Sequence, residues 1–146
     1  MTILDAYAVI AFLKGEAAAG EVEVLVAEGD CSLTAVGVAE VLDHLIRSSG
    51  AEEDDASLDV AQLGLDEPIP VGETLAAAAG RLRARHYHRT RRPVSLADCL
   101  AAEAARLEHR SLATSDPALL DVCHDEGIAV IVLPGSDGTR WTPDPS

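Results

Sequence analysis

The sequence is poor in aromatic residues and cysteines, and it has no long apolar run. Aromatic side chains make up 3% of the 146 residues, so a broad surface for stacking nucleic-acid bases is not expected. The cysteines Cys31, Cys99 and Cys123 are odd in number and far apart, which argues against a CxxC zinc site. No uncharged apolar run approaches the ~18 residues of a membrane span, and the first charged residue is Asp5 rather than a basic leader residue. We therefore expect a reduced, cytoplasmic protein with no membrane segment.

Basic residues are also scarce, at 11 against 25 acidic ones, and the formal net charge is −14. Taken alone, this balance argues against a nucleic-acid partner, because phosphate binding relies on basic surface. However, residues 81–92 read RLRARHYHRTRR and contain six arginines and no acid. Two interpretations of this arginine cluster stay open. It is either a solvated helix end whose cations favour the helix dipole, or a patch that binds phosphate or a protein partner.

Short apolar runs alternate with longer helical patterns along most of the chain, and 48% of the residues are hydrophobic. This length and composition suit one domain with a buried core. Strands separated by helices predict a parallel sheet with helices on both faces. The strands are expected at residues 2–4, 31–34, 68–71, 111–114 and 129–133. The helices are expected at residues 8–14, 17–28, 35–47, 57–64, 73–86, 95–109 and 117–126. Beyond a domain over residues 1–134, Gly, Pro, Asp and Ser predict a C-terminal tail over residues 135–146, with Trp141 as its candidate anchor.

Four acidic residues fall at predicted strand ends or in early helical turns, and each has an ordinary structural explanation. Asp5 and Asp116 suit helix N-caps. Asp98 completes a Ser-x-x-Asp capping box. Glu40 suits an exposed position on its helix. Singly, none of these acids requires a functional role.

Together, the four acids predict a metal site. Helices that follow parallel strands begin at the carboxyl edge of the sheet, so all four side chains are expected at that one edge. Carboxylates that share a cleft repel one another and need either raised pKa values or cations. Their hard oxygen atoms suit Mg²⁺ or Mn²⁺ rather than zinc, and such an ion can activate a water against a phosphodiester. No GxGxxG or P-loop motif is present to indicate a nucleotide cofactor instead.

In four segments the sequence resembles the PIN-domain ribonucleases of the VapC type, which occur in bacterial toxin–antitoxin pairs. The segments are ILDAYAVIAFLKGE, SLTAVGVAEVLDHLIR, PVSLADCLAAEAARL and LATSDPALLDVCHDEGIAVIVLP. With the helices between them they cover most of residues 2–134. The resemblance implies a PIN-like three-layer α/β fold with a five-stranded parallel sheet flanked by helices. It also implies magnesium-dependent endoribonuclease activity, a homodimer, and a cognate antitoxin that blocks the cleft.

The resemblance also assigns roles by position. The catalytic and metal-binding set is Asp5, Glu40, Asp98 and Asp116, with Mg²⁺ as the expected ion and Mn²⁺ as a possible substitute. The small hydroxyl residues that usually precede the last acid are matched by Thr114 and Ser115. Apart from the resemblance, if the arginine cluster binds phosphate, the arginines expected to contact RNA are Arg89, Arg91 and Arg92.

Two positions depart from the family pattern. Tyr7 stands where a serine usually follows the first aspartate, and Gly37 stands where an asparagine usually precedes the glutamate. Neither change removes a carboxylate, so both bear on how the cleft holds RNA rather than on metal binding. One helical turn after Glu40, His44 is expected to be a solvated helix residue.

Two other functions stay open at this point. One is a catalytically weak PIN-like module that binds a partner protein. The other is a metal-dependent nuclease that acts on DNA. Cleavage of RNA by the purified chain separates the first from a ribonuclease, and a parallel digestion of single-stranded DNA separates the second.

Overall fold

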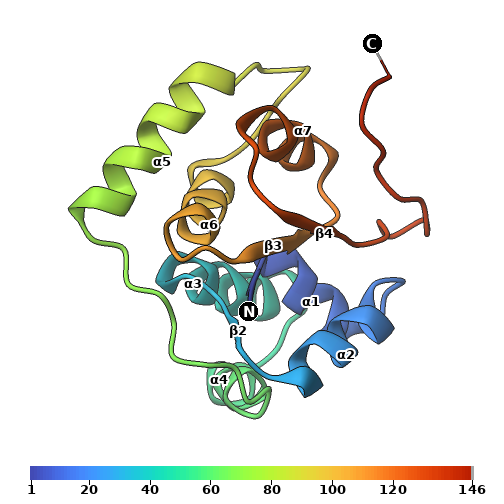
Figure 1. Ribbon diagram of the computed structural model, residues 1–146. Helices are drawn as coiled ribbons and strands as arrows, with labels where there is room; N and C mark the ends of the chain where they lie inside the picture. The colour runs from blue at the N-terminus through green and yellow to red at the C-terminus, as the bar shows by residue number, and fades with distance from the viewer. Residues whose placement is uncertain (146) are drawn as a thin grey trace.

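The computed structural model describes residues 1–145 (Figure 1). Over this range the chain forms four strands, seven α-helices and one π-helical turn. The strands are β1 Thr2–Leu4, β2 Cys31–Ser32, β3 Ser111–Thr114 and β4 Val130–Val132. The helices are α1 Ala6–Lys14, α2 Ala19–Glu28, α3 Ala35–Asp43, the π-helical turn His44–Ser48, α4 Glu53–Ala61, α5 Glu73–His86, α6 Leu96–Leu107 and α7 Pro117–Glu126.

The sheet is parallel throughout, with the strand order β2-β1-β3-β4. It therefore has four strands where the sequence predicted five. The missing strand was expected at residues 68–71, where only Ile69 pairs, through a parallel bridge to Thr34. The N–H of Ile69 donates to Leu33 O at 2.9 Å, and Ile69 O accepts from Ala35 N at 2.8 Å. Prolines flank Ile69 on both sides, and because they have no N–H they cannot extend the ladder.

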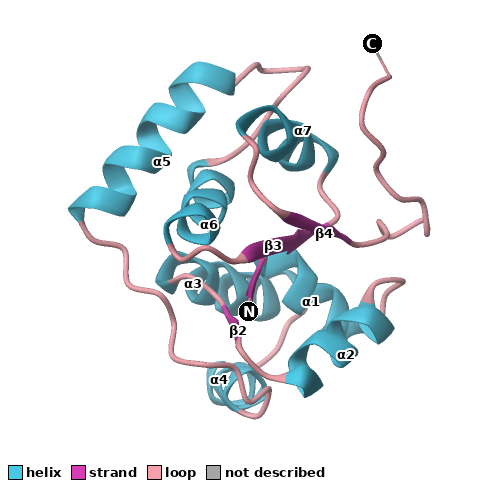
Figure 2. Ribbon diagram, in the orientation of Figure 1, coloured by secondary structure: helices cyan, strands magenta, loops and turns pink. Residues whose placement is uncertain are grey.

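The sheet is the middle layer of three, as Figure 2 shows. Side chains alternate between the two faces of each strand, so Ile3 and Leu112 pack with α5, α6 and α7. Leu4 and Ala113 point the other way and pack with α1, α2, α3 and α4. The predicted fold class, a parallel sheet flanked by helices, is confirmed.

Helix boundaries differ from the prediction mainly at α3 and α4. The helix expected at residues 35–47 changes at His44 into a five-residue π-helical turn. Helix α4 begins at Glu53, four residues before the predicted start, and its first turn holds Glu53, Asp54 and Asp55. Acidic side chains there favour the positive end of the helix dipole. The acidic residues just before the predicted helix thus form the first turn of that helix.

The C-terminal segment lies against the domain although it forms no helix or strand within residues 135–145. Trp141 Nε1 donates to Asp121 Oδ1 at 2.8 Å, and the indole meets His124 edge to face. Arg140 pairs with Glu21 on α2. The predicted anchoring by Trp141 is confirmed. None of the helices in the described part of the chain is long and apolar enough to cross a membrane.

Candidate active site

The carboxyl edge of the sheet brings the predicted acids together. Asp5 directly follows β1, and Asp116 comes two residues after β3. Glu40 lies in the second turn of α3 and Asp98 in the first turn of α6. Helices α1 and α7 both begin at this edge, so their N-termini add positive dipole ends beside the carboxylates.

Asp5 is held by two donors although it is only 4% exposed. Its Oδ2 accepts a hydrogen bond from Thr114 Oγ1 at 2.7 Å, and its Oδ1 accepts a long one from Tyr7 N at 3.4 Å. The N–H of Asp116 donates to Thr114 Oγ1 at 3.1 Å, which leaves the hydroxyl proton for Asp5. Burial, together with the negative charge of Asp98, raises the pKa of Asp5 to about 7 despite these hydrogen bonds.

The capping roles of Asp98 and Asp116 are also real. Asp98 and Ser95 form a reciprocal capping box, in which Asp98 Oδ2 accepts from Ser95 N at 3.0 Å. Asp116 caps α7 through a 2.9 Å hydrogen bond from Ala118 N to its Oδ1. Each of these carboxylates has its other oxygen without a hydrogen-bond donor among residues 1–145. Each side chain can therefore cap its helix with one oxygen and bind a metal ion with the other.

Charge repulsion couples Asp98 to each of the other three acids. Burial raises the pKa of Asp98, and the charge of Asp116 adds to that shift. Burial also raises the pKa of Glu40, with a further contribution from Asp98. Asp98 thus interacts with all three other acids, whereas Glu40 responds to Asp98 alone. Glu40 lies at the margin of the group.

The donor set suits a hard divalent cation. Within residues 1–145, no three His, Cys, Asp or Glu side chains already form a metal-binding arrangement. The four carboxylates nevertheless supply only oxygen atoms, the ligands that Mg²⁺ and Mn²⁺ prefer. Buried carboxylates with raised pKa values and no basic partner gain most from added positive charge. The residues present therefore fit such an ion.

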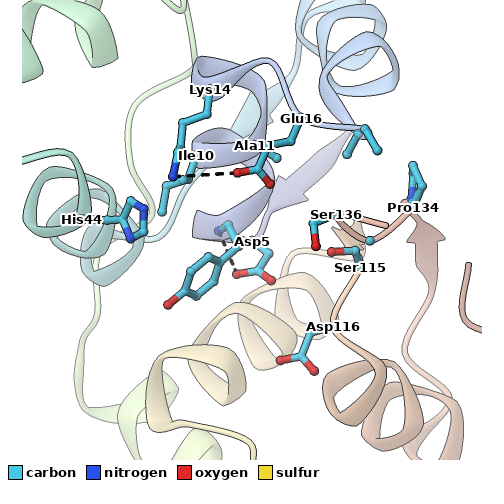
Figure 3. A pocket seen from close by; sticks show the side chains of 14 residues that line it. Asp5, Ile10, Ala11, Lys14, Glu16, His44, Ser115, Asp116, Pro134 and Ser136 are labelled. Atoms are coloured by element: carbon cyan, nitrogen blue, oxygen red, sulfur yellow. Dashed lines mark hydrogen bonds and ion pairs between the residues drawn. The ribbon is translucent and has the colours of Figure 1, made fainter. Parts of the chain in front are cut away.

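A cavity of about 330 Å³ opens beside Asp5 and Asp116 (Figure 3). It extends along α1 as far as Lys14 and is also lined by Ser115 and by residues 134–136. His44 borders it in a half-buried position, with its ring edge to face against Tyr7 at a centroid distance of 6.1 Å. The expectation of a solvated His44 is therefore wrong, because the contact between Tyr7 of α1 and His44 joins parts of the chain that local sequence patterns do not relate.

Sequence reasoning missed Lys14 and residues 134–136 as parts of this cavity. Lys14 is the single lysine in the chain, and it follows Tyr7 by seven residues, a spacing that returns to the same helix face. That spacing was the available signal. Residues 134–136 carry no such sequence signal, because they lie at the predicted boundary between the domain and the C-terminal tail.

Close packing around position 37 is consistent with the glycine that stands there in place of the family's usual asparagine. A Cβ at this position would lie 3.3 Å from Leu33 Cδ2 and 3.4 Å from Thr34 Oγ1. Thr34 is the N-cap of α3 and accepts a hydrogen bond from Gly37 N at 2.9 Å. An asparagine at position 37 would require the Leu33 side chain to move.

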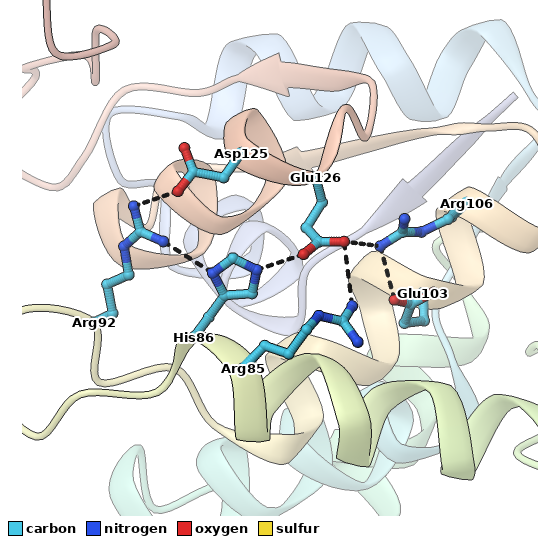
Figure 4. A network of polar contacts seen from close by, with 7 residues as sticks. All are labelled: Arg85, His86, Arg92, Glu103, Arg106, Asp125 and Glu126. Carbon is cyan, nitrogen blue, oxygen red and sulfur yellow. Dashed lines mark hydrogen bonds and ion pairs between the residues drawn. The ribbon is translucent and has the colours of Figure 1, made fainter. Parts of the chain in front are cut away.

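The arginine cluster is largely used inside the fold (Figure 4). Arg92 pairs with Asp125 at 2.7 Å and also donates to His86 Nδ1 at 3.0 Å. His86 in turn lies 2.5 Å from Glu126, which also pairs with Arg85 and Arg106. Contacts with His86, Arg106 and Arg85 lower the pKa of Glu126 to about 2.

Only part of the cluster stays available for a ligand. Arg83 donates to Val94 O at 2.8 Å and lies over the Tyr87 ring. The side chains of Arg89 and Arg91 are exposed and have no hydrogen-bond or ion-pair partner among residues 1–145. The ion-pair network lies at the end of α7, about 15 Å along that ten-residue helix from Asp116.

Comparison with known proteins gives the same fold. A family model for the PIN domain matches residues 2–125. The structure of FitAB bound to an IR36 DNA fragment matches with a TM-score of 0.67 and 21% identity, covering 90% of this chain and 94% of that one. VapBC2 from Rickettsia felis, bound to a DNA fragment from its promoter, matches with a TM-score of 0.65 and 16% identity over 89% and 96% of the two chains. A toxin–antitoxin complex from Klebsiella pneumoniae matches with a TM-score of 0.61 and 16% identity, covering 80% and 87%. Among curated proteins, no significant match was found.

Proposed function

Because this chain belongs to the PIN-domain family of nucleases, we propose that it is a metal-dependent endoribonuclease toxin of the VapC type. The observation that carries the proposal is the group of carboxylates at the carboxyl edge of the sheet. Asp5 and Asp98 are buried, repel each other and have no basic partner within residues 1–145. Such a group is costly for folding and suits the binding of a cation.

In this proposal all four acids contribute to binding the metal ion. Asp5 and Asp98 are the main ligands in this proposal, and Glu40 and Asp116 support the ion or its waters. When bound, Mg²⁺ or Mn²⁺ supplies positive charge against a phosphoryl oxygen and lowers the pKa of a coordinated water. Thr114 positions Asp5 through its hydroxyl group. Ser115 lines the cavity next to Asp116, where it can donate to a phosphate oxygen.

The partner in this proposal is a cognate antitoxin protein. The matched FitAB and VapBC2 structures are described as bound to DNA, and the matched Klebsiella pneumoniae structure is described as a toxin–antitoxin complex. By analogy, a small antitoxin would cover the cleft of this chain, and two copies of the chain would form a homodimer. Light scattering at high micromolar concentration, alone and with the product of a neighbouring small gene, tests both assemblies. A monomer that does not associate with that product would contradict them.

Cleavage assays test the nuclease activity. Purified chain free of antitoxin is incubated with end-labelled structured RNA and, in parallel, with single-stranded DNA, each with Mg²⁺ and with a chelator. We expect Mg²⁺-dependent cuts in RNA that disappear in Asp98→Asn. Cuts in DNA alone would indicate a DNA nuclease, and no cleavage with intact antitoxin binding would indicate a protein-binding module. Either result would overturn the ribonuclease proposal.

A further inference from the structure

The cavity beside the carboxylates continues beyond them. Tyr7 and Lys14 of α1 both line it. Pro134 and Ser136 line it on the side away from His44 (Figure 3). Its volume of about 330 Å³ lies within the ~300–1,000 Å³ range of small-molecule sites. Nothing in the capping or metal-binding roles of the acids requires this extension.

Tyr7 offers an aromatic face in this cavity. Tyr7 is the second residue of α1 and is 57% exposed. The edge-to-face contact with His44 holds the ring from one side, which reduces the number of orientations that it can take. His44 Nε2 is buried and has no hydrogen-bond partner among residues 1–145. An exposed aromatic ring beside a phosphate-cleaving site is suited to stacking with an unpaired base.

Lys14 places the single lysine of an acidic chain at the far end of the same cavity. Its only ion pair among the described residues is to Glu16 at 3.9 Å, and both side chains are well exposed. A pair of this kind contributes little to stability, so Lys14 can exchange Glu16 for a phosphate. Lys14 follows Asp5 by nine residues, a rise of about 13 Å along α1, so its long side chain can reach a phosphate next to the one at the carboxylates.

We propose that this groove binds one unpaired nucleotide next to the scissile phosphate of a single-stranded RNA segment, with Tyr7 stacking on the base and Lys14 contacting the neighbouring phosphate. The inference rests on the proposed ribonuclease function and adds two residues of this chain, Tyr7 and Lys14, that would hold the substrate. Because a base inside a duplex has no free face for Tyr7, single-stranded segments are preferred over double-stranded ones. His44 is a positioning residue that holds the Tyr7 ring.

Binding measurements with matched variants test the groove. The probe is a ten-nucleotide single-stranded RNA of mixed sequence with a fluorescent label, compared with the same strand in a duplex. Anisotropy is measured with Ca²⁺ in place of Mg²⁺, and a gel verifies that the strand stays intact. Tyr7→Ala should weaken single-strand binding about tenfold, whereas Tyr7→Phe should keep it within about twofold. Duplex binding should be weaker in the parent and unchanged in Tyr7→Ala.

Lys14 variants separate charge from shape. Lys14→Gln should weaken single-strand binding and lower the slope of log affinity against log salt by about 0.7, the value for one phosphate contact on a single strand. Lys14→Arg should keep both the affinity and the slope. Glu16→Gln should strengthen binding, because it removes the competing carboxylate. Thermal melts of all variants check that the exposed substitutions leave the fold intact.

Chemical labelling of the parent protein gives a readout that needs no substitution. Because Lys14 is the single lysine, its acetylation rate can be followed by peptide mass spectrometry. The single-stranded RNA should slow this rate severalfold, and the duplex should not. Equal rates with and without the single strand, or unchanged affinity in both Tyr7→Ala and Lys14→Gln, would overturn the inference.

The two proposals fail in different ways. If the parent cleaves RNA but Tyr7→Ala and Lys14→Gln bind as the parent does, the groove is wrong and the ribonuclease stands. If the parent binds single-stranded RNA through Tyr7 and Lys14 but cuts no RNA with Mg²⁺, the groove stands and the ribonuclease proposal is wrong.

Discussion

The two ends of α7 carry acidic residues in opposite electrostatic settings. At its start, Asp116 lies with Asp5 and Asp98, and burial and repulsion raise the pKa of Asp5 to about 7. At its end, Glu126 lies among His86 and two arginines, and their hydrogen bonds lower its pKa to about 2. The same type of group is thus destabilised at one end of the helix and stabilised at the other.

This contrast separates charge kept for folding from charge kept for function. The network at Glu126 satisfies its own charges and ties α5, α6 and α7 together. The group at Asp5 has no basic partner among residues 1–145, so its mutual repulsion opposes folding even though Asp98 and Asp116 also cap helices. The conspicuous arginine cluster therefore serves largely structural contacts, and the scattered acids form the candidate site.

The largest effect is expected on nuclease activity when one of the acids beside the N-terminal end of α7 is changed. Asp98→Asn keeps the size of the side chain and an oxygen for the capping box, but it removes one charge from the ligand set. We expect RNA cleavage to fall at least about 100-fold. In the matched control Glu126→Gln, at the other end of α7, the cleavage rate should stay near that of the parent. Equal losses in the two variants would show that the contrast has no functional meaning.

Added metal should stabilise the protein only through the acids beside the N-terminal end of α7. Mg²⁺ or Mn²⁺ at 100 times its dissociation constant should raise the free energy of unfolding by about 2.7 kcal/mol. Asp5→Asn and Asp98→Asn should lose most of this gain, and Glu126→Gln should keep it. Thermal melts with metal and with a chelator measure the shift. Equal metal-induced shifts in all four proteins would rule out a shared metal site.

The sequence was sufficient to predict the fold class and the edge at which the acids meet. Strand ends and helix starts locate the carboxyl edge of a parallel sheet, so Asp5, Glu40, Asp98 and Asp116 could be grouped without coordinates. The prediction of a fifth strand was wrong because Pro68 and Pro70 lack N–H groups, which limits pairing to Ile69.

Other features depend on contacts between distant parts of the chain, which local patterns do not contain. The partner of Arg92 is Asp125, 33 positions away in the numbering, and the segment between α5 and α6 must lie against α7 before that pair exists. The buried environment that raises the pKa of Asp5 likewise depends on Thr114 and Asp98. Only three-dimensional packing could show which arginines are paired and which acids are not.

The ion pairs of Glu126 at the C-terminal end of α7 should contribute to the stability of the fold. Glu126→Gln removes the charge that pairs with Arg85 and Arg106, and we expect a loss of about 2 kcal/mol in the free energy of unfolding. In the folded protein the pKa of Glu126 is about 2, below its ordinary value of 4.5. This contribution is therefore complete above pH 4.5 and is lost as the pH falls toward 2. Denaturant titrations at pH 7 and pH 3 should show a smaller difference between parent and variant at pH 3.

The opposite pH dependence is expected from Asp5. Its pKa rises from 3.8 to about 7 on folding, so the folded protein binds more protons than the unfolded chain between these values. The free energy of unfolding of the metal-free protein should therefore fall as the pH rises from about 4 to 7 and level off above. Asp5→Asn lacks this loss and should become more stable relative to the parent between pH 4 and pH 8, by up to about 4 kcal/mol, because one pKa unit corresponds to about 1.4 kcal/mol. Denaturant titrations in a chelator measure the difference, and a constant offset across this range would contradict the raised pKa.

The smallest effect is expected at the exposed part of the arginine cluster. Arg89 and Arg91 have no ion-pair partner in the described part of the chain, whereas Arg92 pairs with Asp125. If the exposed pair contacts RNA, Arg89→Gln with Arg91→Gln should lower the slope of log affinity against log salt by about 0.7 per lost contact on a single strand. The double variant should leave the melting temperature unchanged. Arg92→Gln should instead lower the free energy of unfolding by about 1 kcal/mol and change the salt slope little, because its charge is already neutralised by Asp125. An unchanged RNA affinity of the double variant at low salt would assign Arg89 and Arg91 to protein contacts or to solvation.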